Sequence, residues 1–412
     1  EEYLETMDAL DFMWRIRNEI HFQAGKADNQ LTFDMQRRIA AAFGYAGGRR
    51  RGGQKAMDRF MQDYYRAARR LRRFLQIAIR ICDNQAELEF AESGTGDVEQ
   101  ITEYRGQIRA ATKDKNWFAE KPARLMQLFW ICAQKRLPLS PATERRVQEA
   151  LVLVDDAFRA NHVVRRYFTA ICNRPIAGGF ALRQMAAAGL LGAYLPEFEA
   201  IKGIVRYEDF HSFPVDEHTL RAVEALAEIN KMEGNVAQML QETLEHIRDP
   251  HVLVIAILCH DLGKAEGETH VAAGVQLVHE LGNRIGLPEE ETKQIAFLVE
   301  HHMTMSDIAL YRDTDDIEII TTFAGVMKTP DRLRHLLLLT YADLKAVGPT
   351  VWTEWKGALL LKLFLRAERI LLGRADIAEE EYWNLPKAKE AIELAPEAIQ
   401  PKVESHLRDL GE

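Results

Sequence analysis

The sequence has few of the features that mark secreted or membrane proteins. No stretch approaches the length of a membrane span, and the acidic, amphipathic first thirty residues lack the basic-then-apolar layout of a signal peptide. Cysteine is also scarce, and the absence of a CxxC pair argues against a disulfide framework or a zinc finger. We therefore expect a cytoplasmic protein with no membrane partner and with reduced, mostly buried cysteines. The four are Cys82, Cys132, Cys172 and Cys259.

Positive charge is in deficit overall but concentrated in one segment. The 412 residues carry a net charge of −9, with 47% hydrophobic and 28% charged residues, as in ordinary globular proteins of two or three domains. Residues 36–80 contain thirteen Lys and Arg against two Asp, a net charge of +11, which leaves −20 for the rest of the chain. Such a stripe can attract a phosphate-bearing partner, but charge runs are more often solvated helical faces, and we favour that interpretation. Without interleaved aromatics or a known module, the stripe does not indicate nucleic-acid binding.

Strand signals are rare, and helical periodicity dominates the chain. Apolar residues recur at helical spacing in residues 4–16 and again in residues 60–71. Residues 44–54, rich in glycine, predict a flexible loop, and residues 88–111 predict a small β-hairpin. The fold class is therefore all-α.

We divide this all-α chain into three parts by composition. Residues 1–200 form a helical bundle or linker region, and residues 201–375 form a second helical region that carries every clustered histidine. Residues 376–412 are polar, helical and punctuated by proline, which is typical of a linker or docking tail. No repeat of the solenoid kind is found.

One dipeptide stands out chemically. His260-Asp261 ends the apolar run HVLVIAILCHDLGK, residues 251–264, which predicts a buried helix. Burying an imidazole and a carboxylate there is unfavourable unless both are compensated. A divalent metal compensates them together, because it accepts both kinds of ligand. The pair therefore predicts a metal site.

The other candidate ligands lie on separate predicted helices. His218 follows Asp216, which we expect to be a helix N-cap, and Asp343 interrupts the apolar helix HLLLLTYADLKAVG. Helices that project such groups inward can hold a metal between them. Mixed imidazole and carboxylate ligands suit Mn²⁺ or Mg²⁺, with Fe and Zn²⁺ as alternatives. Further candidates, for a second metal or as phosphate donors, are His270, His301 and His302.

A histidine on an apolar face is more often a hydrogen-bonded core residue than a ligand. We assign His211, His251, His279 and His335 to that class. For the four residues His218, His260, Asp261 and Asp343 taken together, a metal site is the better interpretation, because four independent accidents in that order are improbable.

The order His218, His260-Asp261, Asp343 resembles the signature of the HD superfamily of metal-dependent phosphohydrolases. RYEDFHSFPVDEHTLRAVEAL, HDLGKAEGETHVAAGV, VEHHMTMSDIALYRD and LLLLTYADLKAVGPTVWTEWKGALL are similar to the HD domain of the bacterial bifunctional uridylyltransferase/uridylyl-removing enzymes that act on the PII nitrogen-signalling protein. FMWRIRNEIHFQAGKADNQLTFDMQRRIAAAFGY and DRFMQDYYRAARRL resemble the helical region after their nucleotidyltransferase core, and GLLGAYLPEFEAIKGIVRYEDFH resembles their connector. The likeness covers nearly the whole chain.

The resemblance implies a reaction and roles for these residues. It implies hydrolysis of the phosphodiester that joins UMP to a PII tyrosine, with uridylylated PII as partner and UMP as product. A metal held by His218, His260, Asp261 and Asp343 would activate water and polarise a phosphoryl oxygen. Asp261 would also orient the nucleophile, and Lys264 would offset phosphate charge. His270, together with His301 and His302, would bind a second metal or protonate the leaving group.

The sequence also departs from that family. It lacks the Gly-Ser turn followed by an Asp-x-Asp pair of the nucleotidyltransferase, and the chain ends at Glu412 without the glutamine-sensing ACT domains. We therefore expect a central fragment or a shortened relative that does not transfer UMP. Two other functions stay open: an HD phosphohydrolase of nucleotides or (p)ppGpp, and a catalytically idle regulatory module. The native metal, the number of ions and the oligomeric state are not decided by the sequence.

Overall fold

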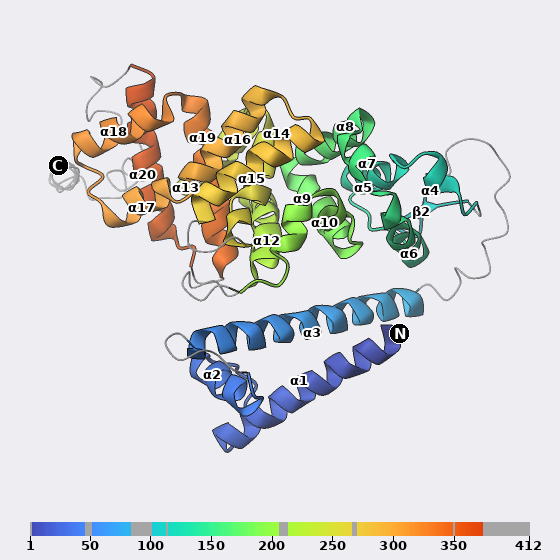
Figure 1. The fold of residues 1–412 in the computed structure, drawn as a ribbon. Coiled ribbons are helices and arrows are strands. Elements are labelled where there is room, and N and C mark those ends of the chain that lie inside the picture. Colours follow the sequence, from blue (N-terminus) through green and yellow to red (C-terminus); the bar gives the residue numbers. More distant parts are fainter. Residues whose placement is uncertain are drawn as a thin grey trace, which may run out of the picture.

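The structure is a computed structural model, and it describes most of the chain as helices (Figure 1). The described residues are 2–45, 52–83, 101–112, 114–205, 213–265, 270–348 and 351–373. Within the helices, side chains are not described at residues 2–3, 52–55, 76–77, 79–83 and 270. The predicted tail at 376–412 thus lies outside the described residues.

The first unit consists of two long helices bridged by a short one. They are α1 (Glu2–Ala24), α2 (Phe33–Ala42) and α3 (Gly52–Asp83). The apolar residues predicted to face inward form a small core of their own around Ile16, Ile39 and Phe60. Leu4 and Trp14 are exposed, so the apolar stripe of α1 is only partly covered. The predicted loop at 44–54 is too long by three residues, because α3 already begins at Gly52.

The middle of the chain starts with the predicted β-hairpin, which the structure confirms within residues 88–111. Strands β1 (Ile101–Tyr104) and β2 (Gln107–Ala110) pair antiparallel, with Tyr104 opposite Gln107. Arg105 and Gly106 have φ of 49° and 73°, the left-handed pair that a two-residue hairpin turn requires.

Short helices follow the hairpin. They are α4 (Trp117–Glu120), α5 (Arg124–Lys135), α6 (Pro141–Glu149), the 3-10 turn η2 (Ala150–Leu153), α7 (Asp156–Ala160), α8 (His162–Cys172), α9 (Pro175–Ala187), α10 (Leu190–Tyr194) and α11 (Pro196–Ala200).

The C-terminal helices carry the predicted site. They are α12 (Val215–Glu228), η3 (Ile229–Lys231), α13 (Asn235–His246), α14 (Pro250–Cys259), η4 (Leu262–Ala265), α15 (His270–Ile285), α16 (Glu289–His301), α17 (Thr304–Tyr311), α18 (Ile317–Met327), α19 (Pro330–Val347) and α20 (Glu354–Leu371).

Helix α14 lies at the centre of this region, packed against α12, α16 and α19. It begins with Pro250 at its first position, where the missing N–H leaves no hydrogen bond unmade. Every side chain from His251 to Cys259 is buried. Each fully buried Val, Leu or Ile contributes about 1.5–3 kcal/mol, which offsets the unfavourable burial of the polar groups at its end. Helix α12 in turn approaches α9 closely: a Cβ on Gly179 would lie 3.3 Å from the Cα of Glu224.

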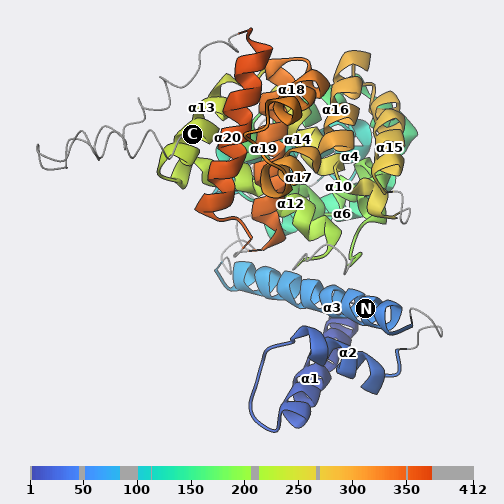
Figure 2. The same cartoon turned by 90° about the vertical axis from the view of Figure 1, so that its left-hand side faces the viewer.

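The helices form one elongated body, α4 to α20, with the α1–α3 unit beside it (Figures 1 and 2). In both views α3 is the helix of that unit that faces the body, while α1 and α2 lie beyond it. Three of the four cysteines are buried and free, as predicted: Cys132, Cys172 and Cys259. Within the described residues, no helix is both long and apolar enough to cross a membrane.

Candidate metal centre

His218 reaches the site from the first turn of α12. The helix starts at Val215, after Pro214, and the backbone N–H of His218 donates to the carbonyl of Pro214 over 2.8 Å. The expectation that Asp216 caps this helix is wrong, because Asp216 already lies inside the first turn. Its carboxylate instead accepts a hydrogen bond from the backbone N–H of Gly203, 2.8 Å away.

His260 and Asp261 enter from the end of α14. His260 follows directly after Cys259, and its Nδ1 lies 2.7 Å from the carbonyl oxygen of Ile257 in the preceding turn. A carbonyl oxygen can only accept, so Nδ1 carries a proton and Nε2 points into the site. This second hydrogen bond is the usual way in which proteins orient a metal-binding imidazole. Asp261 comes next and is 3% exposed.

Asp343 completes the group from the C-terminal part of α19. Its Oδ1 lies 2.9 Å from the Nε2 of His218 and 3.7 Å from the Nε2 of His260. The two imidazole Nε2 atoms are 3.2 Å apart. The Asp343 side chain is 21% exposed, against 1% for each histidine, so the site opens to solvent on the Asp343 side.

Asp261 also lies close to the two imidazoles. Its Oδ2 is 3.4 Å from the Nε2 of His260 and 3.8 Å from the Nε2 of His218. Neighbouring ligands around a metal bound at about 2.0–2.2 Å have separations of this order. His218, His260 and Asp343 offer two imidazole nitrogens and one carboxylate oxygen that all lie within 4.8 Å of one another, a set that fits a divalent cation. Among the described residues, Asp261 lies close to both imidazoles but is not part of that set.

The electrostatics of the site, with the protein atoms alone, show how strongly its carboxylates attract positive charge. Burial alone lowers the pKa of His260, but Asp261 and Asp343 outweigh it and raise that pKa to about 9. Burial tends to raise the pKa of Asp261, yet His260 and Lys264 hold it well below its usual value. Burial tends to raise the pKa of Asp343 too, but the hydrogen bond to His218 and the charges of His260 and His218 together outweigh it and lower that pKa. The site thus keeps both carboxylates ionised.

Lys264 contacts the site through Asp261. Its Nζ lies 2.9 Å from the Oδ2 of Asp261, in the 3-10 turn η4, and the side chain is 6% exposed. The ammonium therefore neutralises part of the negative charge of Asp261 directly.

The three further histidines differ in position. The ring of His302 packs edge-on against the ring of His260, with centroids 5.5 Å apart, and its Nδ1 lies 2.7 Å from the carbonyl of Val299. Burial and the neighbouring His260 lower the pKa of His302. His301 instead stacks on Phe297, at 4.5 Å between centroids, away from the group formed by His218, His260 and Asp343. His270 begins α15, and its side chain lies outside the described residues.

The four histidines that we predicted to be core residues also differ in their burial. His251 is buried beside Glu291, with Nε2 to Oε2 at 3.0 Å, and His335 is buried with Nδ1 2.8 Å from the carbonyl of Asp331. For His279 the assignment is wrong, since its side chain is exposed on α15. His211 lies outside the described residues.

Arg183, which no sequence pattern identifies, holds the helix that carries His218 in place. Its guanidinium on α9 donates to Glu217 over 2.9 Å and to Glu224 over 2.7 Å. Burial disfavours the charged Glu217, but Arg183 and Arg221 outweigh it and lower the pKa of Glu217. A single arginine in FALRQMAAAGL has no periodic signal, and only the tertiary structure brings it to these carboxylates.

Comparison with known proteins divides the chain into three matched regions. Residues 1–79 match the family model "GlnD PII-uridylyltransferase", and residues 103–194 match "Uridylyltransferase GlnD third domain". Residues 215–343 match the HD domain, a match that begins with α12 and ends at Asp343.

Two curated relatives are bifunctional uridylyltransferase/uridylyl-removing enzymes. The one from Phenylobacterium zucineum is 33% identical over 383 residues, which is 89% of this chain and 40% of the relative. The one from Ruegeria pomeroyi is 32% identical over 408 residues, 96% of this chain and 44% of the relative. This chain thus spans less than half the length of either. Among solved structures, a tRNA-processing enzyme aligns with 74% of this chain and 65% of its own at a TM-score of 0.34 and 14% identity, too low to indicate a shared fold.

Proposed function

Because this chain belongs to the family of bifunctional uridylyltransferase/uridylyl-removing enzymes and carries their HD domain, we propose that it hydrolyses the UMP–tyrosine phosphodiester of uridylylated PII. The observation that supports this most directly is the convergence of His218, His260 and Asp343 in one buried place that opens to solvent. The proposal concerns the HD domain, since the relatives are more than twice as long as this chain. We propose that this reaction takes place in the cytoplasm.

The residues support a metal-assisted hydrolysis. A divalent metal, Mn²⁺ or Mg²⁺ from the mixed ligand set, would supply an acidified water and polarise a phosphoryl oxygen. His218 and His260 present Nε2 to it, and Asp343, at the open side, is the ligand nearest to an incoming phosphodiester. Lys264 helps to keep Asp261 anionic, so the Asp261 carboxylate can both hold the metal and orient a water.

The surrounding histidines receive narrower roles than the sequence alone suggests. The carbonyl of Val299 requires the proton of His302 to be on Nδ1, and its lowered pKa keeps Nε2 unprotonated near neutral pH. We therefore propose that His302 acts as a further ligand or a proton acceptor, rather than as the acid that protonates the tyrosyl oxygen. His270 is the better candidate for that acid, because it begins α15 next to η4, which carries Lys264.

The test is release of UMP from uridylylated PII by the purified chain with Mn²⁺. We expect release by the unchanged chain and loss of release in the double variant His260→Ala/Asp261→Ala, with helical content preserved by circular dichroism. His279→Ala is the matched control, since that histidine is exposed, and it should release UMP normally. Normal release by the double variant would refute the metal assignment.

The same assay separates the two alternatives. Faster turnover of free nucleotides or (p)ppGpp than of uridylylated PII would replace the proposal by a nucleotide phosphohydrolase. Binding of PII without Mn²⁺ uptake or any hydrolysis would replace it by an idle regulatory module.

A further inference from the structure

The basic helix α3 touches the metal-binding helix at one charged pair. Arg69 on α3 forms an ion pair with Asp216, which lies two residues before His218 on α12. The two residues are 147 positions apart in the chain. Asp216 is 7% exposed while the Arg69 side chain is 34% exposed, so the pair is partly shielded from water.

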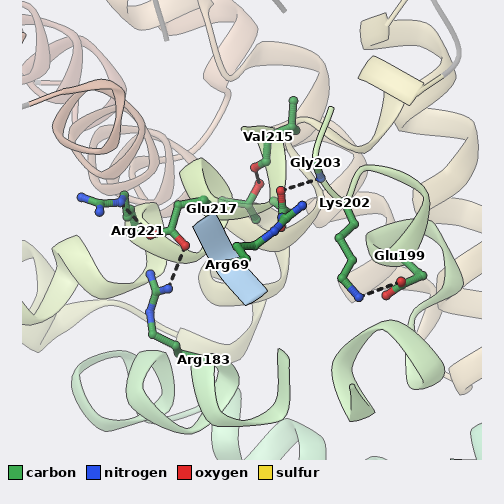
Figure 3. A network of polar contacts seen from close by, with 10 residues as sticks. Arg69, Arg183, Glu199, Lys202, Gly203, Val215, Glu217 and Arg221 are labelled. Atoms are coloured by element: carbon green, nitrogen blue, oxygen red, sulfur yellow. Dashed lines mark hydrogen bonds and ion pairs between the residues drawn. The ribbon is translucent and has the colours of Figure 1, made fainter. Parts of the chain in front are cut away.

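The same carboxylate also binds the connector that precedes α12. While one oxygen of Asp216 meets Arg69, the other accepts the N–H of Gly203. Figure 3 shows Arg69 close to Gly203. Gly203 has φ of +75°, and a Cβ there would lie 2.7 Å from Nη2 of Arg69. The backbone conformation therefore favours glycine, and a Cβ there would force the guanidinium of Arg69 to shift.

An apolar contact supports this junction independently. Val205, two residues after Gly203, is buried in the core of the α1–α3 unit, together with Phe60 and Ile16. The next contact ties the connector to the metal-binding helix, since the N–H of Val215 donates to the carbonyl of Ile204 over 2.8 Å. The connector is thus held by the α1–α3 unit on one side and by the first turn of α12 on the other.

Arg69 differs from its neighbours in the basic stripe. Arg66 pairs with Asp63 in its own helix, and Arg70 pairs with Glu5 of α1. Arg69 reaches out of the α1–α3 unit to the HD region instead. Arg37 and Arg38 pair with Asp34 in α2, so among the ion pairs of the described part of the stripe only that of Arg69 leaves the α1–α3 unit.

We infer that Arg69 and Asp216 form a positioning pair through which the α1–α3 unit sets the place of His218 and, with it, the metal affinity of the HD site. Asp216 holds the first turn of α12, and first turns are the parts of helices that open most easily. His218 lies in that turn, and metal ligands must keep their positions within about 0.2 Å. A change in how α3 docks is thereby transmitted to the site over one helical turn.

The pairing connects two regions that match different family models. Residues 1–79 match the uridylyltransferase model and residues 215–343 match the HD domain. The pair therefore couples the region that matches the transferring enzyme to the site proposed to remove UMP. This last consequence rests on the proposed function, whereas the effect on metal affinity does not.

The experiment measures Mn²⁺ affinity of the full chain by electron paramagnetic resonance in a set of variants. We expect Arg69→Ala and Asp216→Asn each to weaken Mn²⁺ binding by roughly 2- to 30-fold, the range for residues that couple sites without contacting the ligand. Arg69→Lys keeps the charge and should recover part of the affinity. Arg66→Ala, which removes a pair within α3, is the matched control and should bind Mn²⁺ like the unchanged chain.

A double-mutant cycle separates pairing from general destabilisation. If the two residues act as a pair, the double variant Arg69→Ala/Asp216→Asn should bind Mn²⁺ no more weakly than whichever single variant has the lower Mn²⁺ affinity. Additive losses, or a lowered melting temperature with unchanged Mn²⁺ affinity, would overturn the inference. In the hydrolysis assay the variants should need more Mn²⁺ for half-maximal release of UMP, and saturating Mn²⁺ should restore most of the release. A chain that binds Mn²⁺ with the expected dependence on Arg69 but releases no UMP would refute the proposed function and leave this inference standing.

Discussion

The Nε2 atoms of His218 and His260 lie 3.2 Å apart in a site where both rings are almost fully buried. If both nitrogens were unprotonated, their lone pairs would face each other and repel. A proton or a metal between them removes that repulsion. The pair can therefore hold a cation between its two nitrogens, and this arrangement leads to the first prediction.

Adding Mn²⁺ is expected to stabilise the folded chain. A ligand that binds only the folded state at 100 times its Kd adds about 2.7 kcal/mol to the free energy of unfolding. We expect a corresponding rise of the melting temperature by differential scanning calorimetry and its reversal by EDTA. The variant His218→Ala should show no such rise, while His279→Ala should respond like the unchanged chain. An equal rise in His218→Ala would mean that Mn²⁺ binds elsewhere.

Removing Arg183 is expected to destabilise the chain even without metal. Glu217 and Glu224 would lose their shared partner, and hydrogen bonds to charged groups of this kind contribute about 1.5–3 kcal/mol. Urea unfolding of Arg183→Ala should show a loss of that size. Arg221→Ala is the control: Arg221 also contacts Glu217, but it is 41% exposed, so the loss should be below about 1 kcal/mol. Similar losses of unfolding free energy in both variants would contradict the prediction that Arg183 stabilises this part of the fold more than Arg221 does.

The buried cysteines predict a dependence on pH. Burial raises the pKa of Cys132 to about 12 and raises that of Cys172 and Cys259 as well. The folded state therefore keeps thiols where the unfolded chain, with ordinary pKa values of about 8.5, forms thiolates. Stability is unaffected below that pH and falls as the pH rises above it.

We expect a Cys82→Ser chain to leave a thiol reagent unconsumed at pH 8 in the folded state, and to consume three equivalents once unfolded in guanidinium. Consumption by the folded chain would show that these thiols are accessible. The variant is needed because the Cys82 side chain lies outside the described residues.

Much of this architecture was predictable because its signals are local. The apolar run that ends at His260 predicts a buried helix, and the structure has α14 there with its side chains inside. The hairpin follows from turn residues within 88–111. The grouping of His218, His260 and Asp343 was expected from their order and their resemblance to a known family, and the structure brings them together. Their roles as ligands stay predictions.

The rest depends on contacts between distant segments. Aspartate is a favoured N-cap residue, yet α12 begins at Val215, one residue before Asp216. The carboxylate of Asp216 instead binds Arg69 and the N–H of Gly203. No periodicity distinguishes Arg69 from the other arginines of its stripe, because only docking of α3 gives it a partner. His301 and His302 are adjacent in sequence, but helical geometry sends their side chains about 100° apart, so only His302 lies against His260.

Substituting Gly203 is expected to lower the free energy of unfolding by more than backbone strain alone would. Gly203→Ala places a Cβ at a φ of +75° and 2.7 Å from Nη2 of Arg69, so the guanidinium must move. Gly25→Ala has a similar φ of +65° but open space around its Cβ, so it reports the strain by itself, about 1–2 kcal/mol. We expect Gly203→Ala to lose more free energy of unfolding than Gly25→Ala and, unlike it, to weaken Mn²⁺ binding. In an Arg69→Ala background, where the clash is gone, the extra loss should disappear. An extra loss that persists there would show that Gly203 acts through some contact other than Arg69.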